Sequence, residues 1–61
     1  MTLTKADGRY YLMVGHTTII FDSFVNNKDT SNSVALRKGV NTVAVLYFSD
    51  STKFFKAWRA M

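Results

Sequence analysis

The chain has 61 residues and carries eight Lys or Arg against four Asp, so its formal net charge is +4; it contains neither Cys nor Pro. This length predicts a single domain over residues 1–61, and the 48% hydrophobic content excludes a disordered chain. Because no disulfide can stabilise so small a core, we expect association with a second subunit to supply part of the stability.

The first part of the chain predicts a three-strand meander. Asp7-Gly8 separates Thr2–Lys5 from Arg9–Val14, and this dipeptide readily adopts the two positive φ values of a type I′ turn. Gly15-His16 then separates the second strand from Thr17–Phe24, and Gly15 suits the first central position of a type II′ turn. These turns place three strands side by side.

A second hairpin follows a polar segment. Residues 26–33 are polar throughout and predict an exposed loop. The runs Val34–Lys38 and Thr42–Phe48 then flank a turn in which Gly39 or Asn41 takes the left-handed position. The strands therefore number four to five, and all are antiparallel.

The C-terminal segment predicts a short helix over 52–61. Ser49-Asp50-Ser51 offers three candidate N-cap residues. An apolar stripe at helical spacing would dock the helix, with its members at Phe54, Ala57, Trp58 and Met61. The predicted fold class is α+β: a small antiparallel sheet of four to five strands, meander plus hairpin, with one C-terminal α-helix.

Both faces of the predicted strands are apolar. Alternation along a strand sends Leu12 to one face and Tyr11 and Met13 to the other, and the run Val43–Phe48 is apolar on both faces. One short helix covers at most one face, so the sheet must curl into a barrel, pack as a sandwich or pair with a second copy. We expect a homodimer with Val43–Phe48 central, and a curled monomer is the alternative.

The surface buried between the two copies would be either the run Tyr10–Val14 or the run Phe21–Phe24. A second copy is preferred because, of the three arrangements, only this one also relieves a marginal core.

The sequence contains few residues that could carry out catalysis. His16 is the only histidine and is expected to be an exposed turn residue. Asp22 interrupts an apolar strand, where a solvent-facing or edge-blunting role is expected. Clustered metal ligands and a phosphate-binding glycine loop are both missing from the sequence pattern. We therefore expect no enzyme activity, no metal and no cofactor.

The leading hypothesis is a non-enzymatic inhibitor or adaptor that covers a surface of another protein, of the kind found among phages and mobile elements. Its candidate partner-binding residues are Phe55, Tyr11 and Met13. The alternative is binding of single-stranded nucleic acid or an anionic nucleotide by a basic set that comprises Arg37, Lys38, Lys53, Lys56 and Arg59. A structural subunit of a larger assembly is a further alternative.

The expected compartment is inferred from two targeting features that the sequence does not show. The start of the chain has no apolar run typical of a signal peptide, and no stretch approaches the ~20 apolar residues of a membrane span. We expect a cytoplasmic protein that does not act at a membrane.

Overall fold

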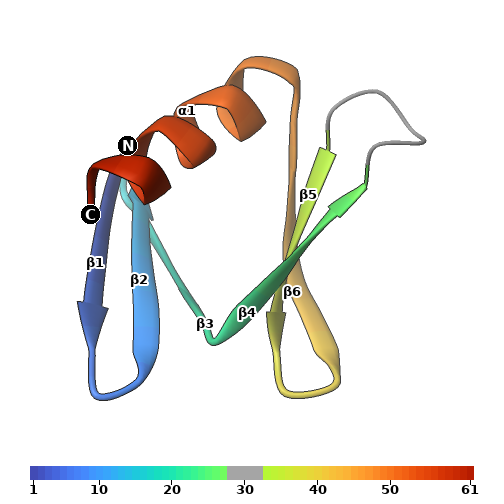
Figure 1. Ribbon diagram of the computed structural model, residues 1–61. Helices are drawn as coiled ribbons and strands as arrows, with labels where there is room; N and C mark the ends of the chain where they lie inside the picture. Colours follow the sequence, from blue (N-terminus) through green and yellow to red (C-terminus); the bar gives the residue numbers. More distant parts are fainter. Residues whose placement is uncertain (28–32) are drawn as a thin grey trace.

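The computed structural model describes residues 1–27 and 33–61. Within these residues, six strands and one helix follow one another (Figure 1): β1 Thr2–Ala6, β2 Arg9–Val14, β3 Thr17–Phe21, β4 Ser23–Asn27, β5 Ser33–Lys38, β6 Asn41–Tyr47 and α1 Phe48–Ala60. The strands form two antiparallel sheets, in the orders β1-β2-β3 and β4-β5-β6. The α+β class with one C-terminal helix is confirmed, but there are two three-stranded sheets in place of one sheet of four to five strands.

The hairpin turns have the conformations that their residues favour. Asp7 and Gly8 have φ values of 53° and 72°, as a type I′ turn requires. Gly15 has a φ of 60°, which fits the first central position of a type II′ turn. In the second hairpin the left-handed position is taken by Gly39, with a φ of 63°. These local predictions hold because each depends on a few adjacent residues.

The predicted strand Thr17–Phe24 is broken at Asp22, and this break creates the second sheet. β3 ends at Phe21 and β4 begins at Ser23. In a straight strand Phe21 and Phe24 would point to opposite faces, because their positions differ by an odd number. The corner at Asp22 reverses this alternation, so that Phe21 is buried in the core and Phe24 packs against the same core.

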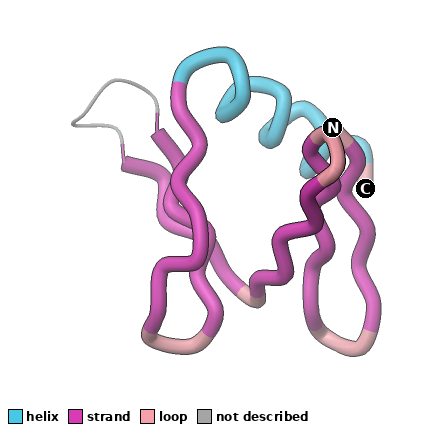
Figure 2. The backbone as a smooth tube through the Cα atoms, turned by 180° about the vertical axis from the view of Figure 1, so that it is seen from behind, coloured by secondary structure: helices cyan, strands magenta, loops and turns pink. Residues whose placement is uncertain are grey.

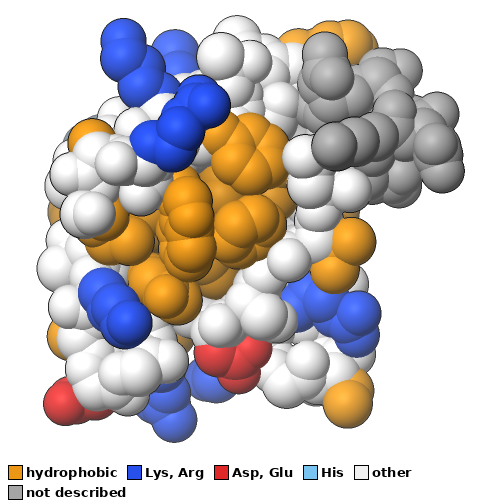
Figure 3. All heavy atoms as spheres, viewed as in Figure 1, with side chains coloured by type: hydrophobic (Ala, Val, Ile, Leu, Met, Phe, Trp, Pro, Cys, Tyr) orange, Lys and Arg blue, Asp and Glu red, His pale blue; other side chains and the backbone are white. Residues whose placement is uncertain are grey.

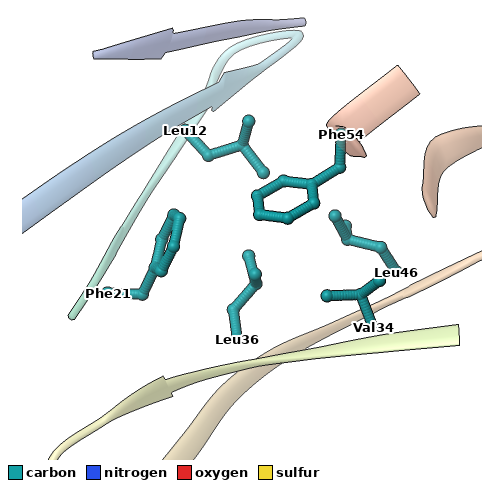
Figure 4. Close-up of a cluster of buried hydrophobic side chains, with 6 residues drawn as sticks. All are labelled: Leu12, Phe21, Val34, Leu36, Leu46 and Phe54. Atoms are coloured by element: carbon teal, nitrogen blue, oxygen red, sulfur yellow. The ribbon is translucent and has the colours of Figure 1, made fainter. Parts of the chain in front are cut away.

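The core lies between the two sheets and below α1, which runs across one end of both sheets (Figures 1 and 2). Its buried side chains come from both sheets and the helix (Figure 4): Leu12, Phe21, Val34, Leu36, Leu46 and Phe54. Phe54 points from the helix into the space between the sheets. Within the predicted docking stripe, Phe54 is therefore the buried residue, and Trp58 packs against the core partly buried.

The helix begins four residues before the predicted start, at Phe48, with Tyr47 as its N-cap residue. Tyr47 makes no side-chain capping hydrogen bond, so the prediction of a cap within Ser49-Asp50-Ser51 is wrong. Those residues lie inside the first turn, where the Ser51 hydroxyl donates to the carbonyl oxygen of Phe48 at 2.6 Å. Asp50 nevertheless lies in the first turn, where a negative charge interacts favourably with the positive end of the helix dipole.

The predicted loop 26–33 is shorter than expected at both ends. Asn26 and Asn27 belong to β4, and Ser33 begins β5. The rest of that prediction, residues 28–32, lies outside the described residues.

Candidate binding surfaces

The outer face of the first sheet carries two of the three predicted partner-binding residues. Met13 and Tyr11 alternate with the buried Leu12 along β2, so they point away from the core. The strand register places Tyr11 opposite Ile20 of β3. Met13 is 51% exposed and Ile20 is also exposed, while Tyr11 is partly buried. We call Tyr11, Met13 and Ile20 the Tyr11 face.

Polar residues surround the Tyr11 face. The register places Met13 between Thr2 and Thr18, and places Thr4 opposite Tyr11. Arg9 lies on the same side of β2, two residues before Tyr11. The face thus has an apolar centre, a threonine border and one cation at its end.

A second apolar surface covers the outer face of the second sheet. Val25, Ala35 and Val45 form one row across β4, β5 and β6. Val43 and Tyr47 share this side of β6 with Val45, because they alternate with Ala44 and Leu46. All but Ala35 are exposed, Val45 by 41% and Tyr47 by 56%. We call this set the valine face, and its members are Val25, Ala35, Val43, Val45 and Tyr47.

A third surface lies where the core opens between the sheets. Six aromatic rings form a continuous network there: Tyr10, Phe21, Phe24, Phe54, Phe55 and Trp58. Figure 3 shows hydrophobic side chains gathered in the middle of this side, between the sheets and below the helix, with Lys and Arg around them. Sequence reasoning missed this cluster, because three of its members lie on the consecutive strands β2, β3 and β4 and the other three on α1, at the other end of the chain.

The aromatic network includes an open hollow of about 430 Å³ lined by Lys5, Tyr10, Trp58 and Met61. The Trp58 and Tyr10 ring centroids lie 4.9 Å apart. The ammonium of Lys5 lies 5.5 Å from the centre of the Tyr10 ring, which is within range of a cation–π interaction. The hollow is therefore lined mainly by apolar side chains, with one cation at its edge.

Phe55, the third predicted partner-binding residue, belongs to the aromatic network. Its ring centroid lies 5.5 Å from that of Phe54 and 5.9 Å from that of Phe24, both in edge-to-face geometry. The aromatic network lies on the core side of the first sheet, whereas Tyr11 and Met13 point to the outer side of that sheet. The structure therefore brings Tyr11 and Met13 together and leaves Phe55 on a different surface.

The five basic residues of the nucleic-acid alternative form two groups. Arg37 and Lys38 end β5 at the turn of the second hairpin, and the other three lie on α1. Figure 1 shows this turn and the helix at opposite ends of the molecule. The Nη2 group of Arg37 donates to the carbonyl oxygen of Val40 at 2.9 Å, so this guanidinium is engaged within its own hairpin.

The two titratable residues considered for catalysis, and expected to have other roles, lie at opposite ends of β3. His16 is exposed in the turn between β2 and β3, and Asp22 is exposed at the corner between β3 and β4. Among residues 1–27 and 33–61, no three His, Cys, Asp or Glu side chains are placed to hold a metal ion. In the same described part of the chain, no helix has the length and apolar character that crossing a membrane demands.

Comparison with known proteins finds no significant match to any protein-family model, curated protein or solved structure.

Proposed function

We propose that this protein is a small non-enzymatic binding protein, an inhibitor or adaptor, that covers a surface of another protein with its Tyr11 face. The observation that carries the proposal is the composition of this face. Its centre is Tyr11, Met13 and Ile20, and its end carries Arg9. Tyr, Met and Arg are the residue types enriched in protein interfaces, and Lys, Asp and Glu, which are depleted there, do not occur on this face.

The exposure of the Tyr11 face is not the result of a loosely packed core. Leu12, between Tyr11 and Met13 in the sequence, is fully buried. The chain thus buries the centre of one side of β2 and leaves Met13 exposed on the other side. Contiguous exposed apolar patches on small soluble proteins commonly mark interaction sites. A single face of a domain this small can supply the ~800 Å² that each partner contributes to a standard interface.

The proposal is tested by affinity capture from lysate of the source cells, with three immobilised baits. Met13→Lys places a charge at the centre of the Tyr11 face, and Val40→Lys adds the same charge at the exposed tip of the second hairpin. We expect the wild type and Val40→Lys to retain one protein in comparable amounts and Met13→Lys to retain at least about tenfold less, since tenfold corresponds to only ~1.4 kcal/mol. Equal retention by all three baits would refute the assignment of the face.

A retained protein also separates the inhibitor or adaptor from a structural subunit. We expect an inhibitor or adaptor to change the activity or the binding of the retained protein when it is added back. A subunit would instead copurify with an assembly that fails to form without it.

A second candidate function, nucleic-acid binding, is supported by one observation. Lys53 and Lys56 border an open hollow of about 300 Å³ that is also lined by Met1, Ala57 and Ala60, so two cations lie beside a hollow on α1. Titration of single-stranded oligonucleotides against salt tests it. Affinity that falls steeply as salt rises, and that Lys56→Ala weakens, would favour this function over the first.

A further inference from the structure

We propose that β6 is a dimerisation strand, which pairs antiparallel with β6 of a second copy around a two-fold axis. The strand has apolar side chains on both of its faces. Ala44 and Leu46 point to the core, while Val43, Val45 and Tyr47 point outward. A strand that is apolar on both faces is typical of a strand that is buried on both faces. The outward side chains of β6 are nevertheless exposed, and the strand stands at the edge of the second sheet, where β5 is its only strand partner among the described residues.

The edge of β6 lacks most of the features that protect edge strands from pairing with other chains. It is the longest strand of the described chain, with seven residues, and contains no Lys, no Pro and no acid. One register shift occurs near its start, opposite Leu36 and Arg37. From Ala44 to Tyr47 the pairing with β5 is regular, so this stretch is straight enough to accept a further strand.

The other strands at sheet edges are less suited to this pairing. β1 carries Lys5, a residue type that discourages edge pairing. β3 is only five residues long and is followed at once by the corner at Asp22. β4, also five residues long, ends in two Asn residues, a residue type depleted in strands.

A second copy fits this edge because a two-fold interface places the residues near its axis beside their own counterparts. In a chain of net charge +4, a cation near the axis would face the same cation of the other copy. The stretch Ala44–Tyr47 contains no cation. With the axis near Val45 and Leu46, the second sheets of the two copies would join into one six-stranded sheet. The two valine faces would then be continuous, and Val45 and Tyr47 of each copy would lie close to those of the other.

The first test measures the mass of the purified chain in solution across a wide dilution series, by light scattering or sedimentation. We expect a dimer that dissociates on dilution. Val45→Lys places a charge in the middle of the regular stretch and is expected to weaken the dimer at least about tenfold. Met13→Lys makes the same charge change on the outer face of the first sheet and is expected to leave the dimer intact.

The second test needs no variant and therefore does not depend on whether Val45→Lys folds. Backbone amide hydrogen exchange of the wild type is compared at high and low concentration. We expect the amides of Ala44–Tyr47 to gain protection as the concentration rises, while those of β1 do not change. A chain that stays monomeric at every concentration overturns the proposal. A dimer that Met13→Lys dissociates also overturns it. The same is true of a dimer in which the hydrogen exchange of the β6 amides does not change with concentration.

Both measurements use the purified chain alone, so their outcome is independent of the capture experiment on the Tyr11 face. A monomer that still captures a partner through the Tyr11 face would refute the dimer and support the proposed function. A dimer that captures no partner would support the dimer and refute the proposed function.

Discussion

The carboxylate of Asp22 accepts a hydrogen bond from the backbone N–H of Gly39, with Oδ2 and the nitrogen 2.9 Å apart, across a separation of 17 residues. The backbone N–H of Asp22 also donates to the carbonyl oxygen of Arg37 at 2.9 Å. One residue therefore joins the corner between β3 and β4 to the turn of the β5–β6 hairpin. The angle between the two sheets is held at this point. Asp22 is exposed, so its expected solvent-facing position is confirmed, and it also forms the corner of the fold.

We expect Asp22→Ala to lower the free energy of unfolding by about 1 kcal/mol, the usual net contribution of one such hydrogen bond. Asp22→Asn keeps an acceptor oxygen and should lose less than half of that. Urea unfolding followed by circular dichroism measures both values. Two variants as stable as the wild type would mean that the Gly39 contact contributes nothing in solution.

Phe54 and Phe55 are adjacent on α1 but differ in burial, and this difference predicts their contributions to stability. Phe54 is fully buried, so Phe54→Ala should cost about 3–5 kcal/mol. A domain of this size has roughly 3–9 kcal/mol in total, at 0.05–0.15 kcal/mol per residue, so this variant should lose a large part of its stability.

Phe55→Ala is the matched variant, because its ring is half-buried against Phe24 and Phe54. It should remain folded and lose about 1–2 kcal/mol, less than a core phenylalanine does. Thermal unfolding of both variants under one set of conditions makes the comparison. Equal losses would contradict the placement of Phe54 in the core.

Phe48, at the junction of β6 and α1, combines two unfavourable features. Its φ is 49°, a left-handed conformation that is rare for a bulky residue, and its side chain is 68% exposed. Because glycine relieves the left-handed strain, which is about 1–2 kcal/mol, Phe48→Gly should be about 1 kcal/mol more stable than Phe48→Ala. Chemical denaturation of the pair decides the matter, and a less stable glycine variant would argue against the left-handed conformation.

Arg37 and Lys38 are adjacent cations with different local roles. The guanidinium of Arg37 bonds to the carbonyl oxygen of Val40, whereas Lys38 is exposed. We expect Arg37→Ala to lose about 1 kcal/mol and Lys38→Ala to stay within ~0.5 kcal/mol of the wild type. The two variants have the same net charge, so a difference in their urea midpoints reports the hydrogen bond, and equal midpoints would dismiss it.

The sequence by itself determined the hairpins, the α+β class and the face of β2. The type I′ turn at Asp7-Gly8 follows from the φ preferences of its two residues. The shared face of Tyr11 and Met13 follows from the two-residue period of a strand. Each of these features depends on neighbours in the chain and needs no distant contact.

Only the tertiary structure decided the corner at Asp22, the inward turn of Phe24 and the separation of Phe55 from Tyr11 and Met13. The partners that make the corner, Arg37 and Gly39, come from another hairpin, and no local pattern around Asp22 names them. Once the chain turns there, the alternation of side chains starts again and every later residue is placed relative to a different sheet. Those placements depend on hydrogen bonds between distant segments, which the order of residues alone does not specify.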